Sequence, residues 1–190
     1  MTKYLTMVSA VALSVSAQAD EVPLADVLMD ENIGCMTGPV EQFGRYIGDW
    51  DIADQGLSQD GKVWTPGNGA RWNFTCVGNG AAVQDFWMPN DADGNKLPGG
   101  GTNLRIYEPK TESWEIAWTA TSAPGFTHIT AKQDENGNIV MHFIKPKQNP
   151  DRRIIFYKPT EEGWNWAMEM TFDDGENWTA VYKIKATPRG

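Results

Sequence analysis

The two histidines are the side chains whose ordinary pKa places their charge change near neutral pH. His128 and His142 lie in consecutive apolar runs that meet at Asn136-Gly137. A loop centred on Asn136 would put both on one face of a hairpin, as diagonal neighbours about 7–8 Å apart. They would then be a candidate acid/base pair or two metal ligands, whereas a two-residue turn would make them ordinary strand residues on opposite faces. No third ligand is spaced to join them, so a zinc site is not predicted. Haem can be held by one His in a barrel of this kind, but nothing in the sequence favours it.

Charged residues inside apolar runs are the second group of candidates, because a buried charge needs a partner. They are Arg71, Asp85, Arg105, Arg152 and Arg153. Asp85 shares a strand face with Trp87, and if that face is interior then Arg71 or Arg105 is its expected partner. A set of Arg71, Asp85 and Arg105 among Trp side chains would anchor an acidic or hydroxylated ligand. The alternative is that these charges point outward from a half-solvated sheet.

Nine tryptophans are an unusual number for a chain of 190 residues. Trp is large, rigid and amphipathic, so it suits both cores and ligand pockets. Strand patterns assign four of them to the core: Trp50, Trp164, Trp166 and Trp178. Three others are candidates to line a cavity, although core packing also accounts for them: Trp87, Trp114 and Trp118.

Residues 1–19 have the features of a secretory signal peptide. Lys3 precedes a mostly apolar run at 4–15, and Ala17-Gln18-Ala19 supplies a small-x-small cleavage pattern. The alternative is a buried N-terminal helix. The apolar run is too short to span a bilayer and no later run is longer, so we predict a periplasmic or secreted protein without a membrane span. The net charge of −9 argues against binding nucleic acid or an anionic membrane.

Cys35 and Cys76 are the only cysteines. In an oxidising compartment two cysteines are expected to form one disulfide, which here would tie an N-terminal segment to the body of the protein. A metal pair or a Cys nucleophile is the alternative, but no Cys or His lies near either residue at ligand spacing. We therefore predict a Cys35–Cys76 disulfide.

The arrangement of apolar runs predicts an all-β protein. Residues 20–46 are expected to form an N-terminal arm with a short helix, and residues 47–187 one β-barrel domain. Within 47–187, about ten alternating runs are separated by pairs such as Asn79-Gly80 and Asp174-Gly175, which enter positive φ at low cost. The runs are 47–54, 70–77, 81–88, 102–108, 113–121, 126–133, 138–145, 152–158, 163–172 and 177–186. This spacing is typical of an antiparallel sandwich or barrel, with 55–69 and 89–101 as long loops at one rim.

The stretch TFDDGENW at 171–178 resembles the Asp-box, a turn motif repeated around sialidase propellers and found singly in other β proteins. One copy is explained by folding chemistry, since Asp173 can accept hydrogen bonds from the loop and Gly175 can take positive φ. A three-residue loop at 174–176 would pair Phe172 with Trp178 and align the apolar faces of the last two runs. We therefore predict a structural turn and no glycan-cleaving activity.

A second resemblance covers more of the chain. The segment FGRYIGDWDI at 43–52 places a short helical turn before Gly48-x-Trp50 at the first strand, which resembles the opening of lipocalin-like (calycin) barrels. The stretch 40–187, with its Trp-rich strands and terminal hairpin, is similar to a family of lipocalin-like secreted bacterial domains of unknown function. The resemblance implies a meandering antiparallel β-barrel with a possible interior cavity. It carries over no catalytic residues.

Three functions remain open at this level. The first is binding a small, partly apolar ligand in a Trp-lined cavity, with Arg71, Asp85, Trp87, Arg105, Trp118, His128 and His142 as candidate contacts. The second is a barrel enzyme of the cyclase, isomerase or hydratase type that uses a His/Arg pocket. The third is a structural or envelope-interaction protein with a packed barrel. No phosphate loop, Ser-His-Asp order or cofactor motif stands out, so no cofactor is predicted, and the oligomeric state is open.

Overall fold

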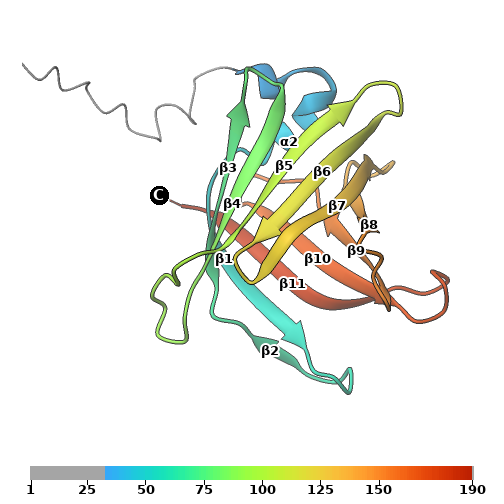
Figure 1. Cartoon of the computed structure of the whole chain (residues 1–190). Coiled ribbons are helices and arrows are strands. Elements are labelled where there is room, and N and C mark those ends of the chain that lie inside the picture. Colours follow the sequence, from blue (N-terminus) through green and yellow to red (C-terminus); the bar gives the residue numbers. More distant parts are fainter. Residues whose placement is uncertain (1–32, 190) are drawn as a thin grey trace, which may run out of the picture.

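The computed structural model describes residues 33–189. The predicted signal peptide at 1–19 and the greater part of the predicted N-terminal arm lie outside the described residues. None of the described helices is long and apolar enough to cross a membrane. The described part of the chain begins with three short helical segments and continues as a single antiparallel sheet (Figure 1).

The sheet closes on itself. Its eleven strands are β1 (Gly48–Leu57), β2 (Trp64–Pro66), β3 (Ala70–Val77), β4 (Ala82–Pro89), β5 (Gly101–Glu108), β6 (Ser113–Ala120), β7 (Ala123–Gln133), β8 (Ile139–Lys145), β9 (Asp151–Phe156), β10 (Trp164–Thr171) and β11 (Thr179–Pro188). From β3 to β11 each strand pairs with the next, and β1 pairs with both β3 and β11. Ten strands therefore form a closed barrel, and β2 extends the free end of β1. Closure leaves no long unpaired edge.

The predicted all-β barrel fold is confirmed, with one difference at 55–69. That segment contains the end of β1 and the short strand β2, which pair across a tight turn. The hydroxyl of Ser58 accepts a hydrogen bond from the Val63 N–H at 2.9 Å, and the Ser58 N–H donates to the Val63 carbonyl at 2.8 Å. Gly61 supplies the positive φ of +72° that the turn requires. The sequence prediction missed this hairpin because its apolar pattern is only three residues long.

One end of the barrel is covered by the helical segments η1 (Ile33–Met36), η2 (Gly38–Val40) and α2 (Glu41–Gly44) (Figure 1). Phe43 and Tyr46 insert below them and are fully buried. The Tyr46 hydroxyl donates to the Tyr157 carbonyl at 3.0 Å, and burial raises the pKa of Tyr46 to about 12, so it remains a donor. Trp50 of the Gly48-x-Trp50 motif donates from Nε1 to the Tyr46 carbonyl at 2.8 Å. These contacts hold the covering segment against the first strand.

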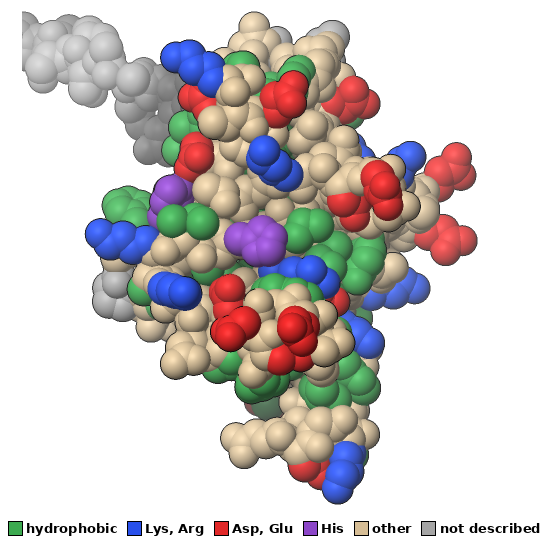
Figure 2. All heavy atoms as spheres, turned by 90° about the vertical axis from the view of Figure 1, so that its right-hand side faces the viewer, with side chains coloured by type: hydrophobic (Ala, Val, Ile, Leu, Met, Phe, Trp, Pro, Cys, Tyr) green, Lys and Arg blue, Asp and Glu red, His purple; other side chains and the backbone are tan. Residues whose placement is uncertain are grey.

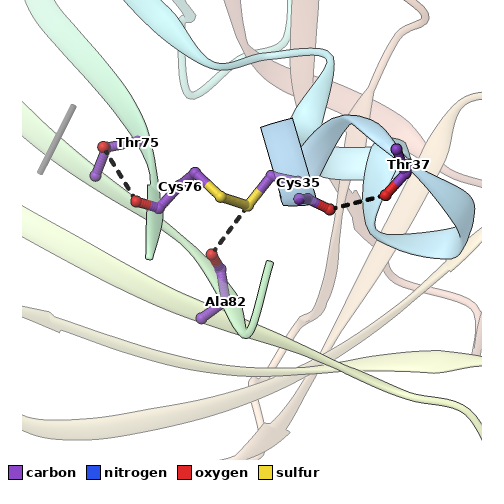
Figure 3. The surroundings of a disulfide bond; sticks show 6 residues. Cys35, Thr37, Thr75, Cys76 and Ala82 are labelled. Carbon is purple, nitrogen blue, oxygen red and sulfur yellow. Dashed lines mark hydrogen bonds between the residues drawn. A yellow bond between two sulfur atoms is a disulfide. The ribbon is translucent and has the colours of Figure 1, made fainter. Parts of the chain in front are cut away.

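The predicted disulfide is confirmed: Cys35 in η1 is bonded to Cys76 in β3, with their Cα atoms 5.8 Å apart (Figure 3). Both residues are buried in the same core cluster as Phe43. The bond links the covering segment to the barrel wall across 41 positions of sequence. It therefore reinforces the closed end.

The turn at 171–178 is built by its own polar side chains. The Thr171 hydroxyl donates to Asp173 Oδ1 at 2.8 Å and accepts from the Gly175 N–H at 2.9 Å. Asp173 Oδ1 also accepts from the Asn177 N–H at 2.8 Å, and Gly175 has a φ of +94°. Each of these residues is thus occupied in closing the loop, as expected for a structural turn.

The predicted register of the β10–β11 hairpin is wrong between the Met168–Tyr182 pair and the turn. The strands pair Met168 with Tyr182, but Val181 is then an extra residue, a β-bulge in β11. The extra residue turns the preceding part of β11 over, so Trp178 lies outside the barrel and not in the predicted core. Phe172, its expected partner inside, is 78% exposed.

Candidate functional site

A cavity of about 430 Å³ lies within the barrel. Its lining is mostly apolar and comes from nearly every barrel strand and from the loop after β8: Trp72, Trp87, Asn103, Arg105, Trp118, Thr127, Ile129, Met141, Phe143, Gln148, Arg152, Ile154, Phe156, Trp166, Met168, Tyr182 and Ile184. Phe156 is buried in the cluster at the helix-covered end, whereas Trp87, Trp118 and Gln148 are partly exposed. The cavity therefore runs from the closed end toward solvent.

Tryptophans on neighbouring strands form one wall. Trp72 in β3 pairs with Trp87 in β4 across the sheet, and their ring centroids lie 5.0 Å apart at 89°. This edge-to-face contact is a favourable geometry for aromatic pairs. The buried Trp72 Nε1 has no hydrogen-bond partner among the described residues. The wall thus offers flat apolar surface to the cavity.

A buried ion pair lies beneath the cavity. Arg105 in β5 donates from Nη2 to Asp85 Oδ2 at 2.5 Å, and both side chains are 0% exposed. Asn103 lies directly opposite Asp85 in the register, and its side-chain amide donates to both carboxylate oxygens at 3.0 and 3.1 Å. The Asp85 carboxylate is therefore fully engaged by residues of β5, and it balances the charge of Arg105.

The other side of Arg105 faces aromatic rings. Its guanidinium carbon lies 4.8 Å from the ring centroid of Phe43, 5.2 Å from that of Phe74 and 5.7 Å from that of Phe156. Its Nη1 and Nε atoms are buried and have no hydrogen-bond partner among the described residues. Arg105 borders the cavity, but its guanidinium is enclosed by Asp85 and the aromatic rings and is not exposed to it.

Tyr182 is a fixed part of the wall. Its hydroxyl donates to the carboxylate of Asp54, which also accepts from the Gly69 N–H at 2.8 Å. Burial, followed by the hydrogen bond to Asp54, raises the pKa of Tyr182 well above its usual value. Tyr182 therefore remains protonated and engaged near neutral pH, which is unlike a general acid or base tuned to that range.

Of the seven residues predicted to contact a ligand, Trp87, Arg105 and Trp118 line the cavity, and Asp85 lies behind Arg105. Arg71 does not join them. It points outward from β3 and pairs with Asp49, whose Oδ1 accepts from Arg71 Nε at 2.7 Å, and this bond raises the pKa of Arg71. The proposed three-residue set is thus corrected to Arg105, Asp85 and Asn103, because the alternation of β3 sends Trp72 inward and Arg71 outward.

The two histidines lie on the outer face of the barrel, where Figure 2 shows the histidine side chains at the surface. Thr130 pairs with His142, which is the register centred on Asn136, but the inward positions of these strands belong to Ile129 and Met141. His128 contacts Glu115 at 2.5 Å with both side chains 47% exposed. Partial burial, together with nearby Arg153, lowers the pKa of His142. The expectation of a shared histidine pocket is therefore corrected.

Several lining residues were not singled out from the sequence as ligand contacts. Arg152 is the important one, because it shares a strand face with Ile154 and Phe156, both buried. That alternation was readable in the sequence and marks Arg152 as inward if Ile154 is inward. Among the described residues, no three His, Cys, Asp or Glu side chains are grouped as a metal site.

Comparisons with known proteins bear on the fold alone. No protein-family model matches the sequence, and neither does any curated protein. Among solved structures the chain is similar to the S-type phycobiliprotein lyase CPES from Guillardia theta, with a TM-score of 0.56 and 11% identity over 85% of this chain and 98% of that one. This likeness and the closed antiparallel topology together support a lipocalin-like barrel. The resemblance to secreted bacterial domains stays a prediction.

Proposed function

We propose that this protein binds a small, partly apolar molecule in the Trp-lined cavity. The observation that carries the proposal is a cavity of about 430 Å³ with mostly apolar walls and a few polar side chains. Small-molecule sites in proteins are about 300–1,000 Å³ and combine apolar walls with a few placed polar groups. The polar side chains that line this cavity include Asn103, Gln148 and Arg152.

The alternatives receive less support. A barrel packed solid would leave no room for a ligand, whereas this one holds a cavity. A barrel enzyme built on His128 or His142 would need at least one of them inside, and both lie on the outer face. Among the described lining residues, the titratable side chains are Arg105, Arg152 and Tyr182. Two arginines and an engaged tyrosine suit recognition better than proton transfer.

We also propose that the protein acts in the periplasm or as a secreted protein. The pattern at residues 1–19 has the order of a signal peptide. A disulfide in the core is compatible with an oxidising compartment. Intact-mass measurement tests this proposal. A mass equal to that of residues 20–190 minus two hydrogen atoms would support both removal of the signal peptide and formation of the disulfide.

The decisive experiment for the binding function is native mass spectrometry of the protein isolated from its own host, followed by solvent extraction. A stoichiometric small molecule is the expected result, and its identity would give the ligand class. A bare protein would be examined next by titration with the neutral fluorescent probe N-phenyl-1-naphthylamine, which brightens in apolar sites. If that probe also fails to bind, the proposed function is wrong.

A further inference from the structure

Two arginines line the cavity, and their charges are treated differently by the fold. Arg105 is paired with Asp85, so its positive charge is already balanced. Arg152 in β9 is partly buried and forms no ion pair with any of the described residues. The cavity lining therefore carries one uncompensated positive charge, at Arg152.

The hydrogen-bonding groups of Arg152 are also unused. Its Nε is buried and has no partner among the described residues. A guanidinium has five N–H donors in a planar fork that matches a carboxylate. Holding such a group partly out of water without an acceptor is unfavourable, which makes an anionic partner the natural complement.

Neighbouring carboxylates are engaged elsewhere. Glu169 accepts from Arg153 Nε at 2.6 Å on the outer face. Asp151 accepts from the backbone N–H of Arg152 at 2.8 Å. Asp54 is held by Tyr182 and Gly69 on the β1 side of the barrel, where β11 and β10 separate β1 from β9. None of these three carboxylates forms an ion pair with the Arg152 guanidinium.

We infer that the ligand is an apolar molecule with a single carboxylate, and that Arg152 binds this carboxylate. The inference rests on the proposed binding function and adds the ligand's charge and its anchor. The apolar body lies against the Trp wall. Arg105 is the weaker anion site because Asp85 already neutralises it, and a second carboxylate there would meet a buried negative charge.

The overall charge of −9 does not oppose this assignment. Exposed charges are screened within about 8 Å at physiological ionic strength, whereas a charge inside a low-dielectric cavity acts strongly on its contents. The acidic surface therefore acts on the approach of the ligand from solution, whereas the charge of Arg152 acts on the ligand inside the cavity.

The test uses the oxidised protein and N-phenyl-1-naphthylamine as a neutral reporter of cavity occupancy. Two pairs of competitors, each an acid and its alcohol, displace the reporter near pH 7: dodecanoate against dodecanol, and 2-naphthoate against 2-naphthylmethanol. Because a charge-assisted bidentate contact is stronger than a neutral one, we expect the acid of at least one pair to compete about tenfold more effectively than its alcohol.

Variants at two adjacent arginines locate the effect. Arg152→Gln should reduce the preference for the acid to within about twofold, whereas Arg153→Gln, which removes the same formal charge from the outer face, should keep it. Arg152→Lys retains the charge without the planar fork and should keep part of the preference. If Arg152→Gln does not fold, as judged by circular dichroism, Arg152→Lys still tests the site, because an unchanged or absent preference there counts against a bidentate anchor.

The outcomes separate the inference from the function on which it rests. Reporter binding without a preference for either acid, or a preference that survives Arg152→Gln, overturns the carboxylate assignment and leaves the binding function standing. Failure of the reporter to bind removes both. Loss of preference in Arg153→Gln as well would show a general charge effect and also overturn the assignment to Arg152.

Discussion

Arg152 and Arg153 are consecutive residues of β9 whose side chains lie on opposite sides of the barrel wall. Arg152 lines the cavity, whereas Arg153 is bonded to Glu169 and its guanidinium carbon lies 4.4 Å from the ring centroid of Trp178 on the outer face. Successive side chains of a strand point to opposite faces, so this arrangement follows from the backbone alone. It gives the protein one arginine with no partner and one with two.

Filling the cavity should abolish binding without unfolding the protein. Thr127→Trp places a large ring in the cavity, and we expect the affinity for N-phenyl-1-naphthylamine to fall by about tenfold or more, because the apolar surface available to the probe is lost. Fluorescence titration measures this change. Thr130→Trp, on the outer face of the same strand, is the control and should bind as the unmodified protein does. Equal affinity in all three proteins would place the probe elsewhere.

Removing one member of the buried ion pair should be strongly destabilising. Arg105→Met leaves Asp85 buried without its charge partner, and we expect the free energy of unfolding to fall by about 3–5 kcal/mol. Urea unfolding followed by tryptophan fluorescence measures the loss. The double variant Asp85→Leu/Arg105→Met removes both charges and should recover part of it.

The surface pair of Arg71 and Asp49 is the matched comparison. Both side chains are partly exposed, so Arg71→Gln should cost less than about 1 kcal/mol in the same urea experiment. A loss as large as that of Arg105→Met would mean that Arg71, and not Arg105, carries the structural pairing.

Reducing the disulfide should loosen the closed end of the barrel. The loop between Cys35 and Cys76 spans 41 positions, for which the chain-entropy model gives about 4 kcal/mol of stabilisation. We expect the double variant Cys35→Ser/Cys76→Ser to unfold at a correspondingly lower urea concentration. A reducing agent should lower the stability of the original protein toward this value and leave the variant unchanged. Sensitivity of the variant to the reductant would show that the effect does not come from this bond.

The turn at Asp173 should respond to acid. Hydrogen bonds from Asn177 and Thr171 hold the pKa of Asp173 below its usual value of 3.8. A carboxyl group with a depressed pKa in the folded state stabilises the fold above its unfolded pKa, and this contribution is lost as the pH falls through the folded pKa. We expect the carboxyl carbon of Asp173 to titrate below 3.8 by NMR. Asn177→Ala should raise that midpoint, and an unchanged midpoint would contradict the assigned cause.

Much of the barrel was readable from the sequence because each strand carries its own alternation. The runs predicted at 70–77 and 102–108, for example, coincide with β3 and β5 to within one residue. The hairpin that carries the two histidines shows the limit of prediction from alternation. The register centred on Asn136 holds from Ile129 to Gln133 and shifts by one residue at His128. Only the burial of Ile129 and Met141 shows which face of the hairpin lies inside.

What the sequence determined by itself was the set of strands, the pair of cysteines available for a disulfide, and the abundance of Trp. What the tertiary structure decided was which face of each strand lies inside. The side-chain period of a strand is two, so a single extra residue such as Val181 reverses the facing of the residues between it and the turn, and moves Trp178 from the predicted core to the surface. Barrel closure likewise placed Arg152 inside and Arg71 outside. Local pattern alone does not settle that choice, because it depends on pairing between strands that are distant in the chain.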